Sequence, residues 1–541
     1  DSAARSVREA LVPLRAFAAF ARADLAGADA ALAGSPPREG ENPALAVSEG
    51  LLRVVSGGYE EAARVTQDAL AATAAEGSHS YDAWLLAIAV AARLCAGGRS
   101  EADRLLRQLE EQDSQLRRGD RAYLHYLRAW RAGLDGDSAD AHREAKLALA
   151  LSIETGIPWF ECLARIAIAQ TGAADQRGVE AQLRAAEDIS ERLRSPWLRY
   201  AVRLALSAAA KQAGDHRAAL AELRMAFRAG HEHGFRQPPG WPSQTLGGLC
   251  ALALEADVEP EFARALVRDG RLTPITPPLG VLRWPWPLRI SSFGGFQCLR
   301  DEAPIELSAK GAGRPMELLK VLVALGMHNV RVDQLADALW PNVEADYAYK
   351  SFTATLHRLR RMLEEEDAVV LRDGRLSLDK SLVWVDTWAL EQLFDDFDAA
   401  LHGSDSCKDE ALRRESVERA LELYRGPFLP DETEQPSYIA HREQMRARLL
   451  RFLAKIARGW EEAGSPEIAI DCYLRFIEAD QLCEPLYRQL MQGCQRSGAS
   501  VEAVAAYERL RTLLSTRAKL MPSPETQALY ARLKSADTGS A

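Results

Sequence analysis

The chain has 541 residues, enough for three or four domains of about 150 residues each. Hydrophobic residues make up 47% and charged residues 27%, close to the globular average, which excludes general disorder. The formal net charge of −10 excludes a generally basic nucleic-acid coat but leaves room for a local basic patch. The sequence has no apolar run of the ~20 residues that a transmembrane helix needs, and its start lacks a signal-peptide pattern. We therefore expect a cytoplasmic protein without a membrane partner.

The eight cysteines are dispersed, and no two of them have CxxC spacing, so neither a zinc ribbon nor a thioredoxin-like site is expected. Unpaired thiols of this kind fit the reducing cytoplasm and commonly lie on buried helix faces. We expect no metal and no cofactor.

Residues 1–270 are rich in Ala, Leu, Arg and Glu, and apolar residues recur at intervals of three and four, which predicts amphipathic helices. A small residue and Gly, followed by polar residues and an Ala-rich stretch, recur every 36 to 42 residues. This spacing is typical of paired-helix repeats that bury their apolar faces against their neighbours. The repeated turns contain Gly57, Gly97, Gly136, Gly172 and Gly214.

These turns resemble those of tetratricopeptide repeats, although the period is longer than the usual one. The resemblance implies a stacked helical solenoid with a concave surface. We favour a sensing role for that surface, with a small-molecule or protein effector as its ligand. The alternative is a scaffold that only spaces two domains.

Residues 271–287 contain five prolines in seventeen positions. Because proline cannot donate a helix hydrogen bond, the solenoid is predicted to end here, in a linker. Trp284 and Trp286 are apolar anchors that we expect to dock on a neighbouring element.

Residues 288–385 alternate between strand and helix patterns. A Gly-Gly pair separates the first two short strands, and Asp373-Gly374 is a strong signal for a two-residue hairpin. This order predicts a winged helix-turn-helix. Its expected elements are strands at 288–290, 296–299 and 305–307, helices at 316–325, 332–339 and 347–365, and hairpin strands at 368–371 and 375–378.

The third of these helices has two different sides. At 100° per residue, its apolar side chains form one stripe, and no Asp or Glu occurs between Tyr347 and Leu363. A basic face opposite an apolar stripe suits the major groove of DNA, where Arg contacts guanine and Lys neutralises phosphate. The alternative is a merely solvated face. The stripe is Ala348, Phe352, Leu356, Leu359 and Leu363; the opposite side holds Lys350, Thr353, Ala354, His357, Arg358 and Arg361, with Arg360 at the flank.

Residues 335–341 (LADALWP) and 356–363 (LHRLRRML) resemble the OmpR-type winged helix, in the version found in Streptomyces antibiotic regulatory proteins. The resemblance implies that the third helix enters the major groove of double-stranded DNA and that the wing reaches the backbone or the minor groove. One departure is Arg331, where the family commonly has a Ser or Thr that caps the second helix. Matched by position, the DNA-contact residues are Thr355, His357, Arg358 and Arg360, with Arg372 and Arg375 on the wing.

Residues 386–541 return to helical patterns, with turns at Gly464 and Gly498 that lie 34 residues apart, the tetratricopeptide period. Together with the segments 424–429, 484–491, 507–510 and 522–526, they resemble the bacterial transcriptional activator domain. The resemblance implies an all-helical module that supports a homodimer on DNA and contacts RNA polymerase.

The same order of segments also resembles the C-terminal half of signal-transducing ATPase regulators. The chain contains no GxxxxGK[ST] phosphate-binding loop. Either an upstream NTPase domain has been removed, which we favour, or the protein never had one. We find no catalytic motif and expect no enzymatic activity from the chain itself.

These patterns predict a mainly α protein with a tetratricopeptide-like solenoid (1–270), a linker (271–287), a winged helix with small β-sheets (288–385) and an all-helical activator domain (386–541). The predicted function is sequence-specific transcription activation, gated by a signal sensed through the N-terminal repeats. The alternative is a helical-repeat interaction scaffold whose winged helix is an adaptor.

Overall fold

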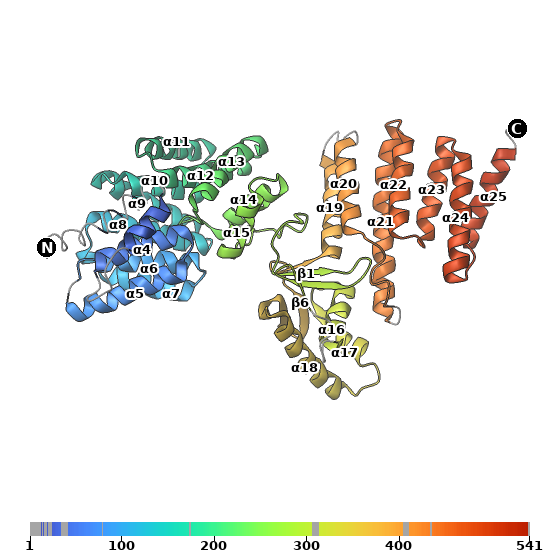
Figure 1. Cartoon of the computed structure of the whole chain (residues 1–541), viewed down its shortest axis with the longest axis horizontal. Coiled ribbons are helices and arrows are strands. Elements are labelled where there is room, and N and C mark those ends of the chain that lie inside the picture. The colour runs from blue at the N-terminus through green and yellow to red at the C-terminus, as the bar shows by residue number, and fades with distance from the viewer. Residues whose placement is uncertain are drawn as a thin grey trace. The chain divides into compact units, whose positions relative to one another are not determined.

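The computed structural model divides into two compact units, Asp1–Trp284 and Pro285–Ala541 (Figure 1). The division falls within the Pro-rich segment 271–287, and both Trp284 and Trp286 are buried. The structure describes residues 24–33, 42–77, 79–172, 175–305, 313–403, 410–432 and 435–538, together with Val12, Arg15 and Ala19. In this described part of the chain, no helix is long and apolar enough to cross a membrane.

The first unit is helical, as its sequence periodicity predicts. After α3, ten helices form five antiparallel pairs, from α4/α5 to α12/α13, and two more helices follow. The helices are α3 (Leu25–Ala33), α4 (Pro43–Ser56), α5 (Tyr59–Glu76), α6 (Asp82–Cys95), α7 (Arg99–Glu111), α8 (Arg118–Leu134), α9 (Ser138–Thr155), α10 (Pro158–Gln170), α11 (Gln176–Arg192), α12 (Pro196–Gln212), α13 (His216–His233), α14 (Ser243–Glu255) and α15 (Pro260–Gly270), with a 3₁₀ turn at Asp113–Gln115.

Each predicted glycine turn joins the two helices of one pair. All five glycines have a left-handed backbone, with φ between 67° and 89°, which a Cβ atom would strain. Small residues then let the helices approach closely; Ala62 and Ala63, for example, are fully buried in the second helix of the first pair. The predicted paired-helix repeats are therefore confirmed.

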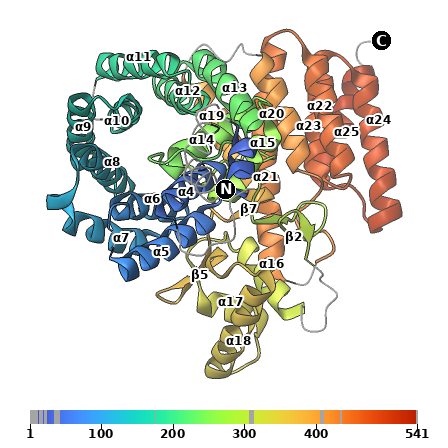
Figure 2. The ribbon, with the colours of Figure 1, turned by 60° about the vertical axis from the view of Figure 1, so that its left-hand side comes forward.

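The pairs follow a curved path, with the first helix of each pair on the inside and the second on the outside (Figure 2). Segment 235–242, which joins α13 to α14, crosses this inner side. The Arg236 amide donates to the Val55 carbonyl of α4 (3.0 Å), and the Tyr126 hydroxyl of α8 donates to the Pro239 carbonyl (2.6 Å). Gly240 lies against Tyr126 so closely that a Cβ atom there would overlap the phenol.

The second unit begins with two small sheets around three helices. The first sheet has the order β3-β2-β1-β7, with β1 and β7 parallel and the other pairs antiparallel; the second has the order β4-β6-β5. The elements are β1 (Leu288–Ser291), β2 (Gln297–Arg300), β3 (Ala303–Pro304), α16 (Gly313–Ala324), β4 (Val330–Arg331), α17 (Val332–Leu339), α18 (Ala345–Leu363), a 3₁₀ turn (Glu366–Ala368), β5 (Val369–Arg372), β6 (Arg375–Leu378) and β7 (Val383–Val385).

This part confirms the predicted winged helix-turn-helix. Helices α16, α17 and α18 pack on one another around a core that includes Leu319, Leu335 and Phe352, all fully buried. The strand predicted at 305–307 is not formed at Ile305, and residues 306 and 307 lie outside the described residues.

In the described residues after β7, seven helices complete the second unit. The predicted turns at Gly464 and Gly498 have φ of 80° and 79°, so both use the left-handed backbone that glycine allows. The helices are α19 (Asp386–Gly403), α20 (Glu410–Leu423), α21 (Pro436–Glu462), α22 (Pro466–Ala479), α23 (Glu484–Ser497), α24 (Ser500–Leu513) and α25 (Pro524–Thr538), with a π turn at Leu514–Ala518. The fold as a whole is mainly α with small sheets, as predicted.

A buried polar cluster holds three of these helices together. The Asp480 carboxylate at the end of α22 accepts hydrogen bonds from the Tyr424 hydroxyl (3.0 Å) and from the Arg446 guanidinium of α21 (2.8 Å). The seven cysteines that are described are free and buried, as their pattern predicts.

Candidate nucleic-acid interface

Helix α18 presents one buried and one exposed side. Its predicted apolar stripe, from Ala348 to Leu363, is buried against α16 and α17. The helix ends at Glu364, whose left-handed backbone (φ 55°) turns the chain toward the hairpin. The carboxylate of Glu364 forms an ion pair with the Arg300 guanidinium of β2 at 2.8 Å. The first of the four acidic residues 364–367 after the helix is therefore neutralised by a cation.

The opposite side of α18 is a basic stripe. Lys350, Thr353, His357, Arg358 and Arg361 are all exposed, and their spacing of three and four residues places them on one face. Residues 347–363 contain four Lys or Arg and no Asp or Glu, so no acidic side chain of this stretch neutralises the face. We call these five residues, together with the exposed Ala354, the α18 basic face.

Two predicted contact residues do not belong to this face. Thr355 is only 6% exposed, because it lies three residues after Phe352 and four before Leu359 in the buried stripe. Its hydroxyl donates to the Ser351 carbonyl at 2.7 Å. A side chain so placed cannot reach a groove from this arrangement.

Arg360 is half-buried and has a structural partner. Its Nε and Nη2 atoms donate to the Val369 carbonyl at 3.0 and 2.7 Å. Val369 is fully buried at the start of β5. The two hydrogen bonds of Arg360 therefore connect the end of α18 to the hairpin. Its direct contact with DNA is therefore not supported by the geometry.

The β5–β6 hairpin forms the predicted wing. Its turn residues Asp373 and Gly374 both have positive φ, 48° and 69°, as a two-residue hairpin turn requires. Arg372 and Arg375 are paired across the hairpin next to this turn, and both are exposed. The Arg375 guanidinium donates to the Asn329 carbonyl at 3.0 Å, which holds that side chain beside β4.

The departure at Arg331 leaves α17 without a side-chain cap. Arg331 occupies the cap position but makes no cap hydrogen bond; its Nε atom pairs with Asp333 at 2.9 Å instead. The Arg331 guanidinium lowers the pKa of the Asp333 carboxyl. The helix nevertheless has the predicted bounds, 332–339.

Two exposed tyrosines near the start of α18 were not among the predicted contact residues. Tyr347 and Tyr349 are 63% and 56% exposed, and the Lys350 ammonium lies 5.5 Å from the centre of the Tyr347 ring. Their position outside the apolar stripe is the sequence signal that could have identified them. Both add hydroxyl groups beside the α18 basic face.

The winged helix is firmly attached to the helices that follow it. The Asp386 carboxylate, at the start of α19, is 3% exposed and accepts hydrogen bonds from the Ser292 hydroxyl (2.7 Å) and the Phe293 amide (2.8 Å) after β1. Burial raises the pKa of the Asp386 carboxyl, and these donors oppose that effect. Farther along, Lys320 of α16 pairs with Glu432, and the side-chain Nε2 of Gln435 donates to the Ala338 carbonyl at 2.9 Å.

Comparison with known families identifies the helices after β7. The family model described as "Bacterial transcriptional activator domain" matches residues 385–534. Its match begins one residue before α19 and ends within α25.

Two curated relatives align with less than half of the chain. Regulatory protein AfsR of Streptomyces coelicolor is 26% identical over 262 residues, which cover 46% of this chain and 24% of that protein. Transcriptional regulatory protein MoaR1 of Mycobacterium tuberculosis is 23% identical over 239 residues, which cover 42% of this chain and 76% of that protein. The chain thus matches only about a quarter of the length of the first relative.

Similar solved structures include EmbR of Mycobacterium tuberculosis in complex with a low-affinity phosphopeptide, which is 22% identical with a TM-score of 0.33 and covers 46% of this chain and 65% of that one. A Rap protein complexed with competence and sporulation factor is 10% identical with a TM-score of 0.36 and covers 84% and 99%. Both TM-scores are low, and the fold described above does not depend on these likenesses.

Proposed function

We propose that this chain, which carries a bacterial transcriptional activator domain and is distantly homologous to regulators of the Streptomyces antibiotic regulatory protein type, activates transcription by binding double-stranded DNA through its winged helix. Helix α18 enters the major groove with the α18 basic face toward the bases. The wing, with Arg372 and Arg375, contacts the backbone or the minor groove.

The observation that carries this proposal is the α18 basic face, which is exposed and lies opposite a fully packed stripe. Arg358 and Arg361 offer planar forks that suit guanine O6 and N7 or a phosphate. Lys350 neutralises a phosphate as a point charge, and the methyl group of Thr353 suits a thymine methyl. These contacts give a sequence-dependent part and a salt-dependent part to the binding free energy.

The helical segment 386–541 supplies the activating half of the mechanism. We propose that it supports a homodimer on repeated half-sites and contacts RNA polymerase, as its family implies. The buried hydrogen bonds of Asp386 support the proposal that the winged helix binds DNA and the following helices activate, because they fix the DNA-binding helices relative to α19. When the winged helix binds DNA, these hydrogen bonds therefore hold α19 in a fixed orientation relative to the DNA.

We further propose that residues 1–270 gate the activity through an effector, that residues 271–287 link the two units and that residues 288–385 bind DNA. The separate compact unit up to Trp284 supports this arrangement, since a unit with its own core can bind an effector by itself, while the segment that follows it connects it to the winged helix.

The test is in vitro selection of genomic DNA fragments by the purified chain. The double variant Arg358→Ala, Arg361→Ala is put through the same selection for comparison. The control is Arg64→Ala, Arg104→Ala, which removes the same charge from exposed positions of α5 and α7, outside the segments proposed to bind DNA and to dimerise. The account predicts fragments with a repeated half-site for the wild type and for the control, and loss of that enrichment in the α18 variant.

Weak and salt-sensitive recovery by all three proteins, without a shared half-site, would overturn the proposal. The interaction-scaffold alternative would then be favoured, and it would be supported if the α18 variant still regulated transcription.

A further inference from the structure

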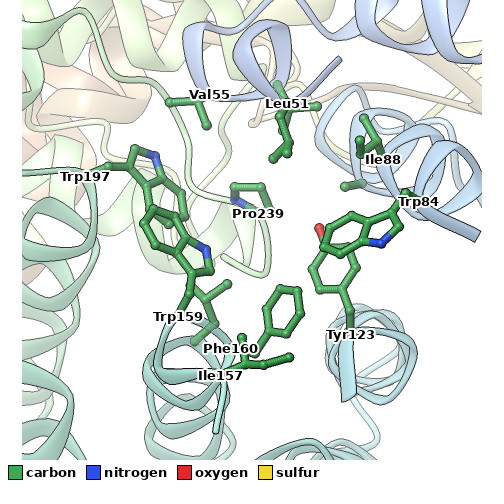
Figure 3. Close-up of a pocket in the computed structure, with 13 residues that line it drawn as sticks. Leu51, Val55, Trp84, Ile88, Tyr123, Ile157, Trp159, Phe160, Trp197 and Pro239 are labelled. Atoms are coloured by element: carbon green, nitrogen blue, oxygen red, sulfur yellow. The ribbon is translucent and has the colours of Figure 1, made fainter. Parts of the chain in front are cut away.

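The inner face of the first unit contains a cavity of about 230 Å³. It is lined from α4, α6, α8, α10 and α12, the first helices of all five pairs, and from segment 235–242, which crosses it (Figure 3). The lining residues are Leu51, Val54, Val55, Trp84, Ile88, Ala91, Tyr123, Ile157, Trp159, Phe160, Leu163, Trp197 and Pro239.

Aromatic rings form two opposite walls of this cavity (Figure 3). On one side, the ring of Tyr123 stacks on those of Phe160 (5.1 Å between centres) and Trp84 (6.1 Å), with interplanar angles of 14° and 22°. On the other side, Trp159 and Trp197 stack at 5.3 Å and 7°. Within each wall the rings are therefore nearly parallel, and a flat ring system in the cavity can stack on such a wall, because offset stacking is the preferred contact between aromatic groups.

The cavity favours an uncharged occupant. None of the thirteen described lining residues is charged, so an anion inside would lose hydration without gaining a cationic partner, and a cation would find only the faces of aromatic rings. Burial raises the pKa of the Tyr123 phenol, which therefore stays protonated and can donate a hydrogen bond. A peptide backbone fits less well, since its many N–H and C=O groups would find few partners among these side chains.

The volume sets the size of the occupant. An apolar cavity of about 150 Å³ holds one benzene ring, so about 230 Å³ accommodates more than one ring. Four of the aromatic lining residues, Trp84, Tyr123, Trp159 and Phe160, are only half-buried, so part of their surface is accessible to a ligand.

We propose that this cavity binds an uncharged, flat aromatic small molecule of about two rings, stacked between the Trp84–Tyr123–Phe160 wall and the Trp159–Trp197 wall. Binding itself is independent of the winged helix. Only the use of the ligand as the effector that gates transcription rests on the proposed function.

Two fluorescent probes test this inference on the full chain. At neutral pH, 1-aminonaphthalene is uncharged, and 5-aminonaphthalene-1-sulfonate has the same two fused rings with one negative charge. The expected result is saturable binding of the uncharged probe at one site per chain, with energy transfer from tryptophan. The anionic probe should bind at least about tenfold more weakly, because its sulfonate loses hydration in the cavity.

Variants that fill the cavity test whether the probe binds inside it. Ile157→Trp fills the cavity and should abolish binding, while Ile153→Trp adds the same ring at a 53% exposed position of α9 and should leave it unchanged. Leu51→Phe is a milder filling variant, from a half-buried position of α4, in case the first does not fold; circular dichroism reports the helical content of each.

Binding that is equal for both probes, absent in the folded wild type, or unaffected by the folded filling variants would overturn the inference. DNA binding, measured in the same samples, separates it from the proposed function. Intact DNA binding without probe binding contradicts the cavity alone, whereas intact probe binding without any DNA binding contradicts the winged-helix mechanism alone.

Discussion

The two arginines Arg358 and Arg360 lie two residues apart on α18, but the structure gives them different tasks. Arg358 is exposed on the α18 basic face, and Arg360 donates two hydrogen bonds to the buried Val369 carbonyl. We expect Arg360→Ala to lower the free energy of unfolding by about 1–3 kcal/mol, since a buried carbonyl loses a charged donor. Arg358→Ala should change it by less than about 0.5 kcal/mol, as is usual at exposed sites.

Their effects on DNA binding should be reversed. If Arg358 contacts a phosphate, its loss makes the negative slope of log K for DNA association against log salt concentration shallower by about 0.9. If it contacts a base, its loss weakens the binding free energy for the selected site by about 1–3 kcal/mol. Folded Arg360→Ala should keep the wild-type slope.

Chemical unfolding and DNA titrations at several salt concentrations measure both quantities for the two variants. The reasoning is refuted if Arg360→Ala lowers the salt slope by about one without a loss of stability, because Arg360 would then be the DNA contact.

Three further outcomes follow from named contacts. Burial lowers the pKa of His441 from its usual value to about 4, so the folded state binds a proton at His441 less well than the unfolded state does. Up to about 3 kcal/mol of the free energy of unfolding, present above pH 6.5, should therefore be lost as the pH falls toward 4. Denaturant unfolding of His441→Leu should lack this part of the pH dependence. Asp386→Ala leaves two buried amides without an acceptor and should lower the free energy of unfolding by about 3–5 kcal/mol; a loss below about 1 kcal/mol in the same assay would contradict the attachment proposed for it. Replacing Arg372 and Arg375 by Ala should weaken binding to selected and unrelated fragments alike in gel-shift titrations, and a changed half-site would contradict a backbone role for the wing.

Local patterns predicted much of the fold. The turns at Gly57 and Gly464 follow from glycine spacing, because a left-handed helix end favours glycine wherever it occurs. The wing follows from Asp373-Gly374 for the same reason. The buried and exposed sides of α18 follow from its 3.6-residue period.

Contacts between distant residues were not predictable in this way. The sequence does not show that the Val369 carbonyl accepts hydrogen bonds from Arg360, a residue that the family resemblance places among the DNA contacts. Thr355 lies at the edge of the apolar stripe, where a small difference in helix rotation decides between burial and exposure. The parallel pairing of β1 with β7 and the convergence of five helices on one cavity likewise depend on how separate elements pack.

The most direct test of DNA binding through the α18 basic face is methylation interference on the selected half-site. N7-methylguanine blocks contacts in the major groove, and N3-methyladenine blocks the minor groove. For the wild type, we predict interference by methylated guanines within each half-site. Arg358→Ala should lose that interference at one guanine position while the others remain. Interference restricted to the minor groove, or an identical pattern for the variant, would contradict the claim that Arg358 contacts a base in the major groove.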